Sequence, residues 1–442
     1  EITIKERCDE LAATLCAGLL EEMDRQVRED REARKEWVVS RVDERSILGV
    51  MGEIRYSRTY YRNKETGEHR HLSDGMCGIT PHMRVTPMFR ANLVGKSCEI
   101  PYGKAGKQTG RCAVSGQTVM NSLRKLEFGP AREKSATSEG KKRRVSKLYI
   151  EADEGHISGN RNRRKRIEPK LVYVHEGRRK VGSGRGALIN PKYFGGVYND
   201  PDELWWEVHH YIEKNYDVSA LEVVFVTGDG ASWITLGIEF VEKGVRLPDL
   251  FHLREYVVAA SHGDKGLASK LWKAVDTADR AKTEILLDTA ESTAVTKGQM
   301  KSVVRCRTYL GNMWGAIENR RKYLQETVGC SAEGHVSHVY AERMSSRPAS
   351  WSKTGADTMA RLRVMVANGE SVRDYALASA VSSFEDIQID KTRAQQLRSG
   401  VTAKVRTAEG YLRAQLGNLP VLKGKTSFTA RALRGLRDRL AV

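Results

Sequence analysis

The sequence has 442 residues, of which 40% are hydrophobic and 29% charged, a balance typical of a soluble folded protein. Lysine and arginine outnumber aspartate and glutamate by 74 to 56, so the formal net charge is +18. The length allows two to four domains. No run approaches the roughly 18 consecutive apolar residues of a membrane span, so we expect no integral membrane protein.

The positive charge is concentrated in two zones. Residues 141–180 carry a net charge of +9 and residues 391–442 carry +10, while the remainder of the chain is close to neutral. This distribution indicates a polyanionic partner, most simply a nucleic acid. The alternative is solvated surface charge that only aids solubility.

The cysteines argue against a disulfide framework. Their number is seven, which is odd, and no Cys-x-x-Cys pair occurs. A disulfide scaffold and a zinc ribbon are therefore not expected. We expect reduced thiols in a cytoplasmic protein.

The first part of the chain, residues 1–128, has α+β character. Apolar residues recur every four positions within 3–38, which predicts an amphipathic helix. Residues 52–62 have β-type composition, and a turn at 64–67 suggests a hairpin. Arg55 and Arg58 alternate with tyrosines here, a mixture that can contact phosphates and stack on bases. An ordinary strand with exposed arginines is the alternative.

Residues 87–127 have a helical pattern. Ser115 is a good N-cap for a helix that follows it. With a preceding helix it would form a helix-turn-helix, although residues 101–106 include a proline and two glycines. Gln117, Asn121 and Arg124 would then point at a DNA groove. Helix pairs without this role are also common.

Residues 129–146 are polar and rich in residues that break helices and strands, so we predict a linker there. A different pattern of secondary structure follows it. Strands are predicted at 147–153, 170–176 and 221–227, a short strand followed by a turn at 245–252, and helices at 201–215 and 232–243. This alternation is typical of an α/β sheet. A basic turn between the first two strands holds four further candidate DNA contacts, Arg163, Arg164, Lys165 and Arg166.

The rest of the chain has no strand pattern. Residues 254–330 are rich in alanine, lysine and leucine and read as a helical insertion, and polar glycine-containing loops surround Glu333. Beyond them the chain is helical and increasingly basic. The expected divisions are 1–128, 129–146, 147–253, 254–330, 331–390 and 391–442.

Two aspartates follow predicted strands. Asp153 ends the first strand, and Asp229 ends an apolar strand between two glycines. Ligands gather at the carboxyl ends of strands in an open α/β sheet, so these carboxylates could share a metal. Hard oxygen ligands select Mg²⁺ or Mn²⁺. A turn or helix cap is the other explanation for each aspartate. Asp249 and His252, three residues apart after another strand, could orient a substrate phosphate.

Four short motifs in this order resemble the ISLre-two family of bacterial insertion-sequence transposases. They occupy residues 149–156, 228–234, 249–252 and 333–351. Weaker similarity covers residues 52–56 and 115–119. The resemblance therefore extends over most of the chain.

The resemblance implies a DDE recombinase that cuts and joins DNA. The implied fold is an α/β RNase H-like catalytic core with an all-helical insertion, preceded by an α+β N-terminal DNA-binding region and followed by a helical basic tail. Asp153, Asp229 and Glu333 would hold two Mg²⁺ (or Mn²⁺) ions, and His252 would assist near the scissile phosphate. Glu318 and Glu342 are alternatives for the last carboxylate.

The resemblance also implies partners and a location. The substrate would be double-stranded DNA, both element ends and target, and pairing two ends requires a homodimer or higher oligomer. The protein would act in the bacterial cytoplasm at the nucleoid. Two other functions remain open. One is a transposase-derived DNA-binding protein without catalysis. The other is a carboxylate-pair hydrolase such as a glycosidase, which gives the basic zones no role.

Overall fold

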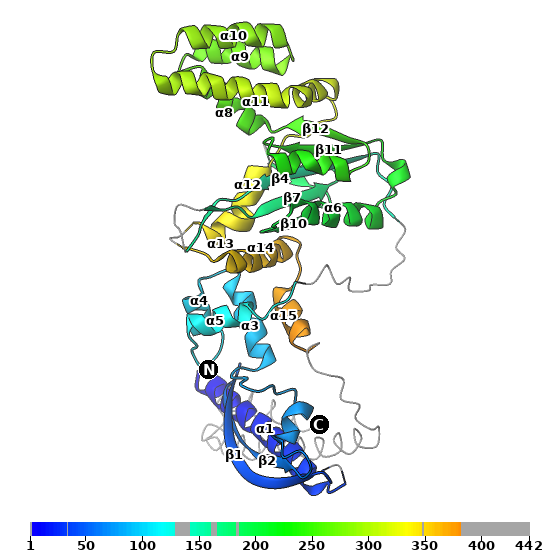
Figure 1. Cartoon of the computed structure of the whole chain (residues 1–442), viewed down its shortest axis with the longest axis vertical. Helices are drawn as coiled ribbons and strands as arrows, with labels where there is room; N and C mark the ends of the chain where they lie inside the picture. The colour runs from blue at the N-terminus through cyan, green and yellow to red at the C-terminus, as the bar shows by residue number, and fades with distance from the viewer. Residues whose placement is uncertain are drawn as a thin grey trace, which may run out of the picture. The chain divides into compact units, whose positions relative to one another are not determined.

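The computed structural model describes residues 2–32, 34–128, 142–160, 166–182, 185–346 and 349–381 (Figure 1). The chain divides into two compact units, each described by itself below. The first contains residues 1–97, 101–122 and those from 373 onward, and the second contains residues 98–100 and 123–372. The predicted tail at 391–442, most of the predicted linker and the candidates Arg163, Arg164 and Lys165 lie outside the described residues.

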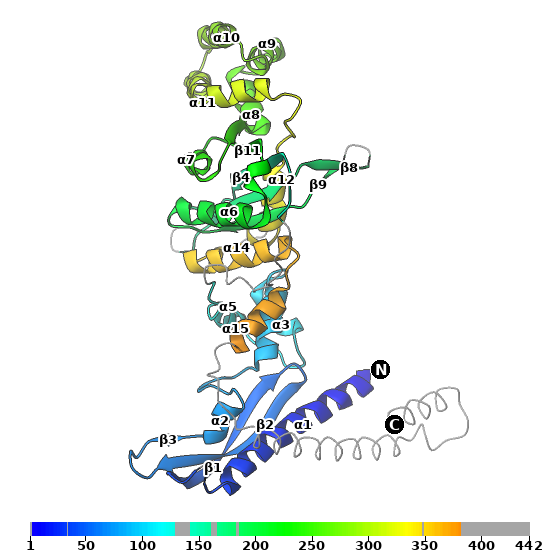
Figure 2. The ribbon, with the colours of Figure 1, turned by 90° about the vertical axis from the view of Figure 1, so that its right-hand side faces the viewer.

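The first unit begins with a long helix on a curved hairpin. Helix α1 (Ile2–Glu29) lies along strands β1 (Trp37–Gly49) and β2 (Gly52–Asn63), and β3 (His69–Arg70) adds two residues (Figure 2). Buried Asp24 on α1 accepts hydrogen bonds from Thr59 N of β2 and from Ser73 Oγ beyond the hairpin, so the helix is fastened to the hairpin and to the segment that follows it. The predicted helix at 3–38 is thus too long, because its last residues form β1.

Four helices follow the hairpin, α2 (Leu72–Met76), α3 (Pro87–Ser97), α4 (Tyr102–Gln108) and α5 (Gly116–Leu123). Ser115 Oγ accepts from Thr118 N, the cap that the sequence predicts. Pro101 stands at the N-cap of α4, where its missing N–H costs nothing. A Cβ on Gly106 would lie 2.2 Å from the Val114 carbonyl oxygen, so glycine permits the close turn between α4 and α5.

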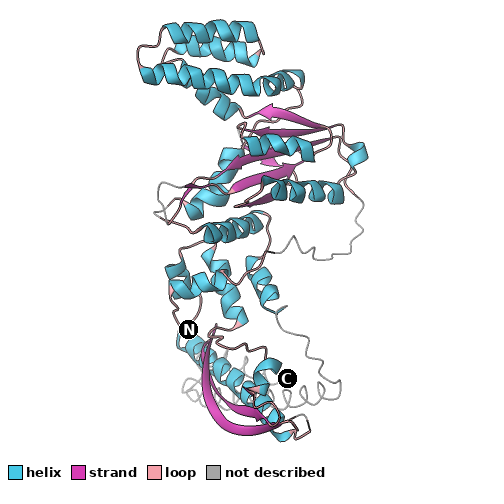
Figure 3. Ribbon diagram, in the orientation of Figure 1, coloured by secondary structure: helices cyan, strands magenta, loops and turns pink. Residues whose placement is uncertain are grey.

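A mixed five-stranded sheet forms the centre of the second unit (Figure 3). Its order is β10 (Lys192–Gly196), β7 (Lys170–His175), β4 (Lys147–Glu154), β11 (Val223–Gly228) and β12 (Gly244–Pro248). The first three strands are antiparallel neighbours, whereas β4, β11 and β12 run parallel. Two small ribbons lie outside it, β5 (Ile157–Ser158) with β6 (Arg166–Ile167), and β8 (Arg178–Gly182) with β9 (Arg185–Leu188).

The two faces of β4 differ in chemistry. Leu148, Ile150 and Ala152 face one way and join the core formed with helix α6 (Pro201–Asn215). Trp205 of α6 is fully buried in that core and donates to the Trp233 carbonyl oxygen. Because strand side chains alternate, Glu151 and Asp153 face the other side of the sheet.

The connections around β11 and β12 are short and helical. The 3₁₀ turn η1 (Val218–Ala220) precedes β11, and α7 (Ser232–Leu236) with η2 (Gly237–Phe240) leads to β12. Four helices then occupy the stretch where the sequence predicts an insertion, α8 (Leu250–Ala260), α9 (Lys265–Asp276), α10 (Arg280–Ser292) and α11 (Lys297–Lys322). They bury an apolar core of their own, separate from the core between the sheet and α6.

The segment that the sequence predicts as polar loops around Glu333 is helical instead. It comprises α12 (Ala332–Val336), a π-helical turn η3 (Ser337–Ala341) and α13 (Glu342–Met344). Val336, Tyr340 and Met344 recur at helical spacing and are all buried, so packing outweighs the polar composition. Helix α14 (Lys353–Ala367), which packs on β10, is the last helix of the second unit, and α15 (Val372–Val381) belongs to the first unit from Arg373 onward.

Candidate acidic active site

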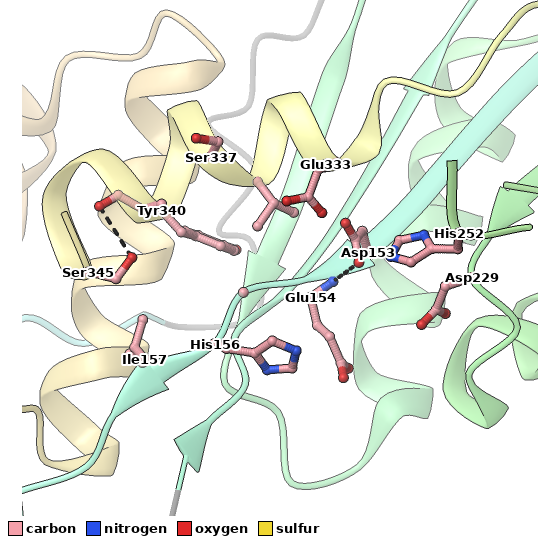
Figure 4. Close-up of a pocket in the computed structure, with 13 residues that line it drawn as sticks. Asp153, Glu154, His156, Ile157, Asp229, His252, Glu333, Ser337, Tyr340 and Ser345 are labelled. Atoms are coloured by element: carbon pink, nitrogen blue, oxygen red, sulfur yellow. Dashed lines mark hydrogen bonds between the residues drawn. The ribbon is translucent and has the colours of Figure 1, made fainter. Parts of the chain in front are cut away.

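One pocket of about 350 Å³ in the second unit collects four of the predicted site residues. Asp153, Asp229, His252 and Glu333 line it together and point toward the same space (Figure 4). They come from β4, from the residue after β11, from the start of α8 and from α12. The three parallel strands deliver their carboxyl ends to one edge of the sheet, which explains how residues so distant in sequence meet.

Asp153 is the most deeply buried of the four. Its residue surface is 7% exposed, and its Oδ1 accepts a hydrogen bond from Glu154 N at 2.8 Å. Its Oδ2 is buried and has no hydrogen-bond partner. Burial raises the pKa of Asp153 to about 7, with Glu333 and Asp229 adding to the shift and His252 opposing it. A buried carboxylate oxygen without a donor is expensive, so this atom calls for an explanation.

Asp229 stands in a tight turn. Its Oδ1 accepts from Ala231 N at 2.9 Å, the capping role that an aspartate after a strand often has. A Cβ on Gly228 would lie 2.8 Å from Ile234 side-chain carbons. Gly230 adopts φ +96°, and a Cβ there would lie 2.7 Å from Met313 Sδ. Both glycines therefore hold the loop close to its neighbours, and Asp229 lies between them.

The Asp249 side chain has two partners. Its Oδ1 accepts from Phe251 N and caps α8, while its Oδ2 lies 2.9 Å from His252 Nδ1. The hydrogen bond with Asp249 is the main reason that the pKa of His252 rises to about 9, although burial opposes it. Asp153 and Asp229 raise it further. His252 thus places a positive charge beside the pocket carboxylates at neutral pH.

Glu333 lies in the first turn of α12 with its side chain exposed toward the pocket. The alternatives for the last carboxylate are placed elsewhere. Glu318 on α11 accepts from Trp314 Nε1 at 3.1 Å, and Glu342 on α13 pairs with Arg363 at 3.5 Å. Neither lines the pocket.

The carboxylates share the pocket without converging on one point. Among the described residues, the trio of acidic and histidine side chains whose ligand atoms all lie within 4.8 Å is Glu154, His156 and Glu168. Asp153, Asp229 and Glu333 are spread more widely than that. Glu154 accepts from Trp233 Nε1 at 2.8 Å and lies 3.7 Å from Lys170 Nζ, so its carboxylate already has partners.

The structure places the candidate DNA contacts in different settings. Arg55 is exposed and pairs with Glu53, whereas Arg58 is turned inward onto Asp74 with its side chain 14% exposed. Gln117 and Asn121 are exposed on α5 and hydrogen-bond to each other at 3.0 Å, and Arg124 is exposed just beyond that helix. Arg166 is exposed on β6.

Sequence reasoning overlooked one buried acid, Glu151. It lies two residues before Asp153 on the same face of β4 and is 2% exposed. Burial opposes its ionisation, but hydrogen bonds from His175, Ser331 and Tyr173 outweigh that effect and lower its pKa to about 2. A glutamate flanked by Tyr149, Ile150 and Ala152 is the feature of the sequence that could have revealed it.

The fold and the pocket define a mixed α/β protein with an acidic, histidine-flanked site at the carboxyl edge of its parallel strands. Residues 1–379 match a family described as an uncharacterised protein family, UPF0236. The chain belongs to this family. Among the described residues, no helix is both long and apolar enough to cross a membrane.

Its relatives carry the same family name. A UPF0236 protein of Caldanaerobacter subterraneus subsp. tengcongensis is 33% identical over 98% of this chain and 90% of its own length. Another from that strain, 32% identical over 98% of this chain and 90% of its own length, has a name that joins eleven locus designations. A Streptococcus gallolyticus relative is 28% identical over 80% of this chain and 79% of its own length.

Proposed function

We propose that the chain is a DDE-type transposase of the ISLre-two kind, which cuts the ends of an insertion sequence and joins them to target DNA. The observation that carries the proposal is the unpartnered, buried Oδ2 of Asp153 in a pocket shared with Asp229, Glu333 and His252. Buried polar atoms without partners mark places where strain, an ion or a reaction is accommodated.

The sheet supports the proposed RNase H-like core. Strand β4 lies in the middle, with an antiparallel pair on one side and two parallel strands on the other. This order is compatible with the RNase H-like arrangement that the resemblance implies. The helices α8–α11 between β12 and α12 occupy the place of the proposed all-helical insertion.

The donor set fits two Mg²⁺ or Mn²⁺ ions held by Asp153, Asp229 and Glu333. All three offer carboxylate oxygens, which hard divalent cations prefer. The three carboxylates are spread around the pocket rather than gathered on one point, which suits a site that would hold more than one ion. When bound, such ions activate a water or a 3′-hydroxyl and stabilise the leaving oxygen.

His252 has a separate role in this proposal. Its imidazolium, held by Asp249, would bind a non-bridging oxygen of the scissile phosphate and orient it toward the carboxylate edge. Hydrolysis of one phosphodiester bond then leaves a 3′-hydroxyl on the element end. That hydroxyl attacks a phosphodiester bond of the target, and the displaced target oxygen leaves with a proton.

The relatives add an independent argument. A protein name that joins eleven locus designations of one strain describes a sequence present many times in one genome. Mobile elements multiply in this way. We therefore propose a bacterial, nucleoid-associated protein that binds double-stranded DNA and pairs two element ends as a homodimer or higher oligomer.

A cleavage and strand-transfer assay tests the proposal. Wild type is incubated with element-end duplexes and Mg²⁺, beside the single variants Asp153→Ala, Asp229→Ala and Glu333→Ala. Each substitution is expected to lower the rate more than about 100-fold, since even outer partners of metal ligands contribute about 10–100-fold. Glu176→Gln is the matched control, because Glu176 is a hydrogen-bonded acid after β7, outside the pocket.

The assay also separates the alternatives. A transposase-derived binding protein would retain end binding but show no cleavage in wild type, and Asp229→Asn would leave its function unchanged. Full activity of Glu333→Ala, with both aspartate variants inactive, would show that another residue supplies the last carboxylate.

A further inference from the structure

The buried carboxylate of Glu151 accepts hydrogen bonds at both of its oxygens. Its Oε1 lies 3.0 Å from both His175 Nε2 and Arg178 Nη2. Its Oε2 accepts from the Tyr173 hydroxyl at 2.5 Å, and from the backbone N–H and, at 3.2 Å, the hydroxyl of Ser331. Tyr173 and His175 belong to β7 of the sheet and Arg178 to β8 of the neighbouring ribbon, whereas Ser331 lies 180 residues further along the chain.

Ser331 is the residue from which α12 begins. It stands at the N-cap, yet its side chain makes no capping hydrogen bond, because its hydroxyl accepts instead from Arg178 at 2.6 Å. Its N–H is directed to Glu151 rather than to solvent. The start of the helix is thus fixed by the sheet, and Glu333 follows two residues later.

A second anchor lies on the other side of Glu333. The His335 ring packs on Tyr173 with 4.6 Å between ring centroids, and its Nδ1 lies 3.0 Å from the Tyr193 hydroxyl. The helical segment that α12 opens, continued by η3 and α13, is short, and isolated helices of such length are marginal without tertiary contacts. Glu333 therefore stands between two residues that β4, β7 and β10 hold in place.

We propose that Glu151 is a positioning residue, whose buried carboxylate fixes the start of α12 and so places Glu333 opposite Asp153 in the acidic pocket. The inference rests on the proposed function, because it assigns Glu151 a purpose within the divalent-cation site. Glu151 and Asp153 project from the same face of β4. This strand therefore supplies the buried aspartate of the pocket and, through Glu151, fixes the position of the distant Glu333.

The alternative is that Glu151 only stabilises the fold. A stabilising residue would weaken the protein generally, whereas a positioning residue acts on cation binding through Glu333. A double-mutant cycle distinguishes the two, because an effect transmitted through Glu333 disappears once Glu333 is removed.

The experiment measures Mn²⁺ binding to the full-length chain by calorimetry. The variants are Glu151→Gln, Glu333→Gln, their combination, Asp153→Asn, and the control Glu176→Gln. Glu176 is a suitable control because it also accepts from an arginine and a tyrosine, Arg143 and Tyr216, and follows the end of β7 remote from Asp153. Gln is nearly isosteric with Glu, but its amide cannot accept at both positions.

We expect Glu151→Gln to weaken Mn²⁺ binding by about 10–100-fold, the effect typical of partners behind metal ligands. The double variant should bind no more weakly than Glu333→Gln alone, and the control should bind as wild type does. Unchanged Mn²⁺ binding in Glu151→Gln would overturn the inference, and so would a double variant whose loss of affinity is the sum of the two single losses. In either case the proposed function itself would stand, provided that Asp153→Asn still abolishes binding.

Two further outcomes are informative. If wild type does not bind Mn²⁺, or Asp153→Asn binds it equally well, the proposed function fails and the inference with it. If Glu151→Gln does not fold by circular dichroism, Ser331→Ala replaces it, since it removes the bridging hydroxyl but retains the N–H. Ser331→Ala should weaken Mn²⁺ binding several-fold in the otherwise wild-type chain and not at all in the Glu333→Gln background. Any other pattern contradicts the inference.

Discussion

The Asp153 side chain destabilises the native state when it is ionised. Its pKa is raised from its unfolded value near 3.9 to about 7. The folded chain therefore binds a proton more tightly than the unfolded chain, and stability falls as the pH rises from about 4 to about 7. We predict that Asp153→Asn raises the free energy of unfolding by roughly 1–3 kcal/mol at pH 8 and little at pH 4.

Urea denaturation with EDTA present, at pH 4, 6 and 8, measures this effect. Asp217→Asn is the control of opposite sign, because the Ser219 hydroxyl and N–H hold the pKa of Asp217 below its usual value. The ionised Asp217 carboxylate stabilises the folded chain above the unfolded pKa of aspartate, and this stabilisation is lost as the pH falls. Asp217→Asn should therefore be less stable than wild type at pH 8. A destabilised Asp153→Asn at pH 8 would contradict the account of that carboxylate.

The Asp249–His252 pair leads to a prediction about the titration of His252. The pKa of His252 is raised to about 9, chiefly by the hydrogen bond with Asp249. The pair therefore contributes full stability below the unfolded histidine pKa near 6.5 and loses it as the pH rises through 9. NMR titration of Asp249→Asn should show the His252 pKa falling toward 6.5, while asparagine still caps α8. Asp264→Asn, at the N-cap of α9, should leave that pKa unchanged.

At the scale of elements, the insertion has its own core and should unfold as a separate unit. Leu271 on α9 is fully buried among the residues of α8–α11. We predict that Leu271→Ala costs about 2–5 kcal/mol and lowers amide protection in α8–α11, with little change in β4 and β11. Hydrogen exchange measures this, with Leu204→Ala in the sheet–α6 core as the reciprocal control. Equal loss of protection in both cores would contradict it.

Elements with a strong local pattern were predictable from the sequence. Helix α6 has the predicted bounds, and β4, β7 and β11 lie within two residues of theirs. Strand β1 was missed because charged residues interrupt its pattern and its pairing with β2 decides its conformation. Helix α12 was missed because its sheet contacts, rather than helical propensity, stabilise it.

The site was predictable to a similar extent. Parallel strands bring their carboxyl ends together, so a shared pocket for Asp153 and Asp229 followed from the strand pattern alone. Glu151 could not be assigned a role in advance, because its partners on β7, β8 and Ser331 become neighbours only in the folded chain. The inward turn of Arg58 onto Asp74 likewise depends on a residue 16 positions away.

At the scale of the whole molecule, the last prediction follows from the charge distribution. Residues 391–442, outside the described part, carry a net charge of +10 and none of the four motifs. Each Lys or Arg that contacts a DNA phosphate adds about 0.9 to the slope of log binding constant against log salt. Deleting this tail should weaken binding to any duplex and flatten the slope by several units, as measured by fluorescence anisotropy across 50–200 mM salt.

A chain whose tail residues are scrambled is the matched control, because it retains charge and length. It should bind as wild type does if the tail acts through phosphate contacts, which carry no sequence information. A slope that deletion leaves unchanged would show that the tail is ordinary surface charge. In the proposed function, the other basic zone, at 141–180, would then have to supply the attraction that brings a phosphate backbone toward Asp153, since the pocket's own carboxylates would repel it.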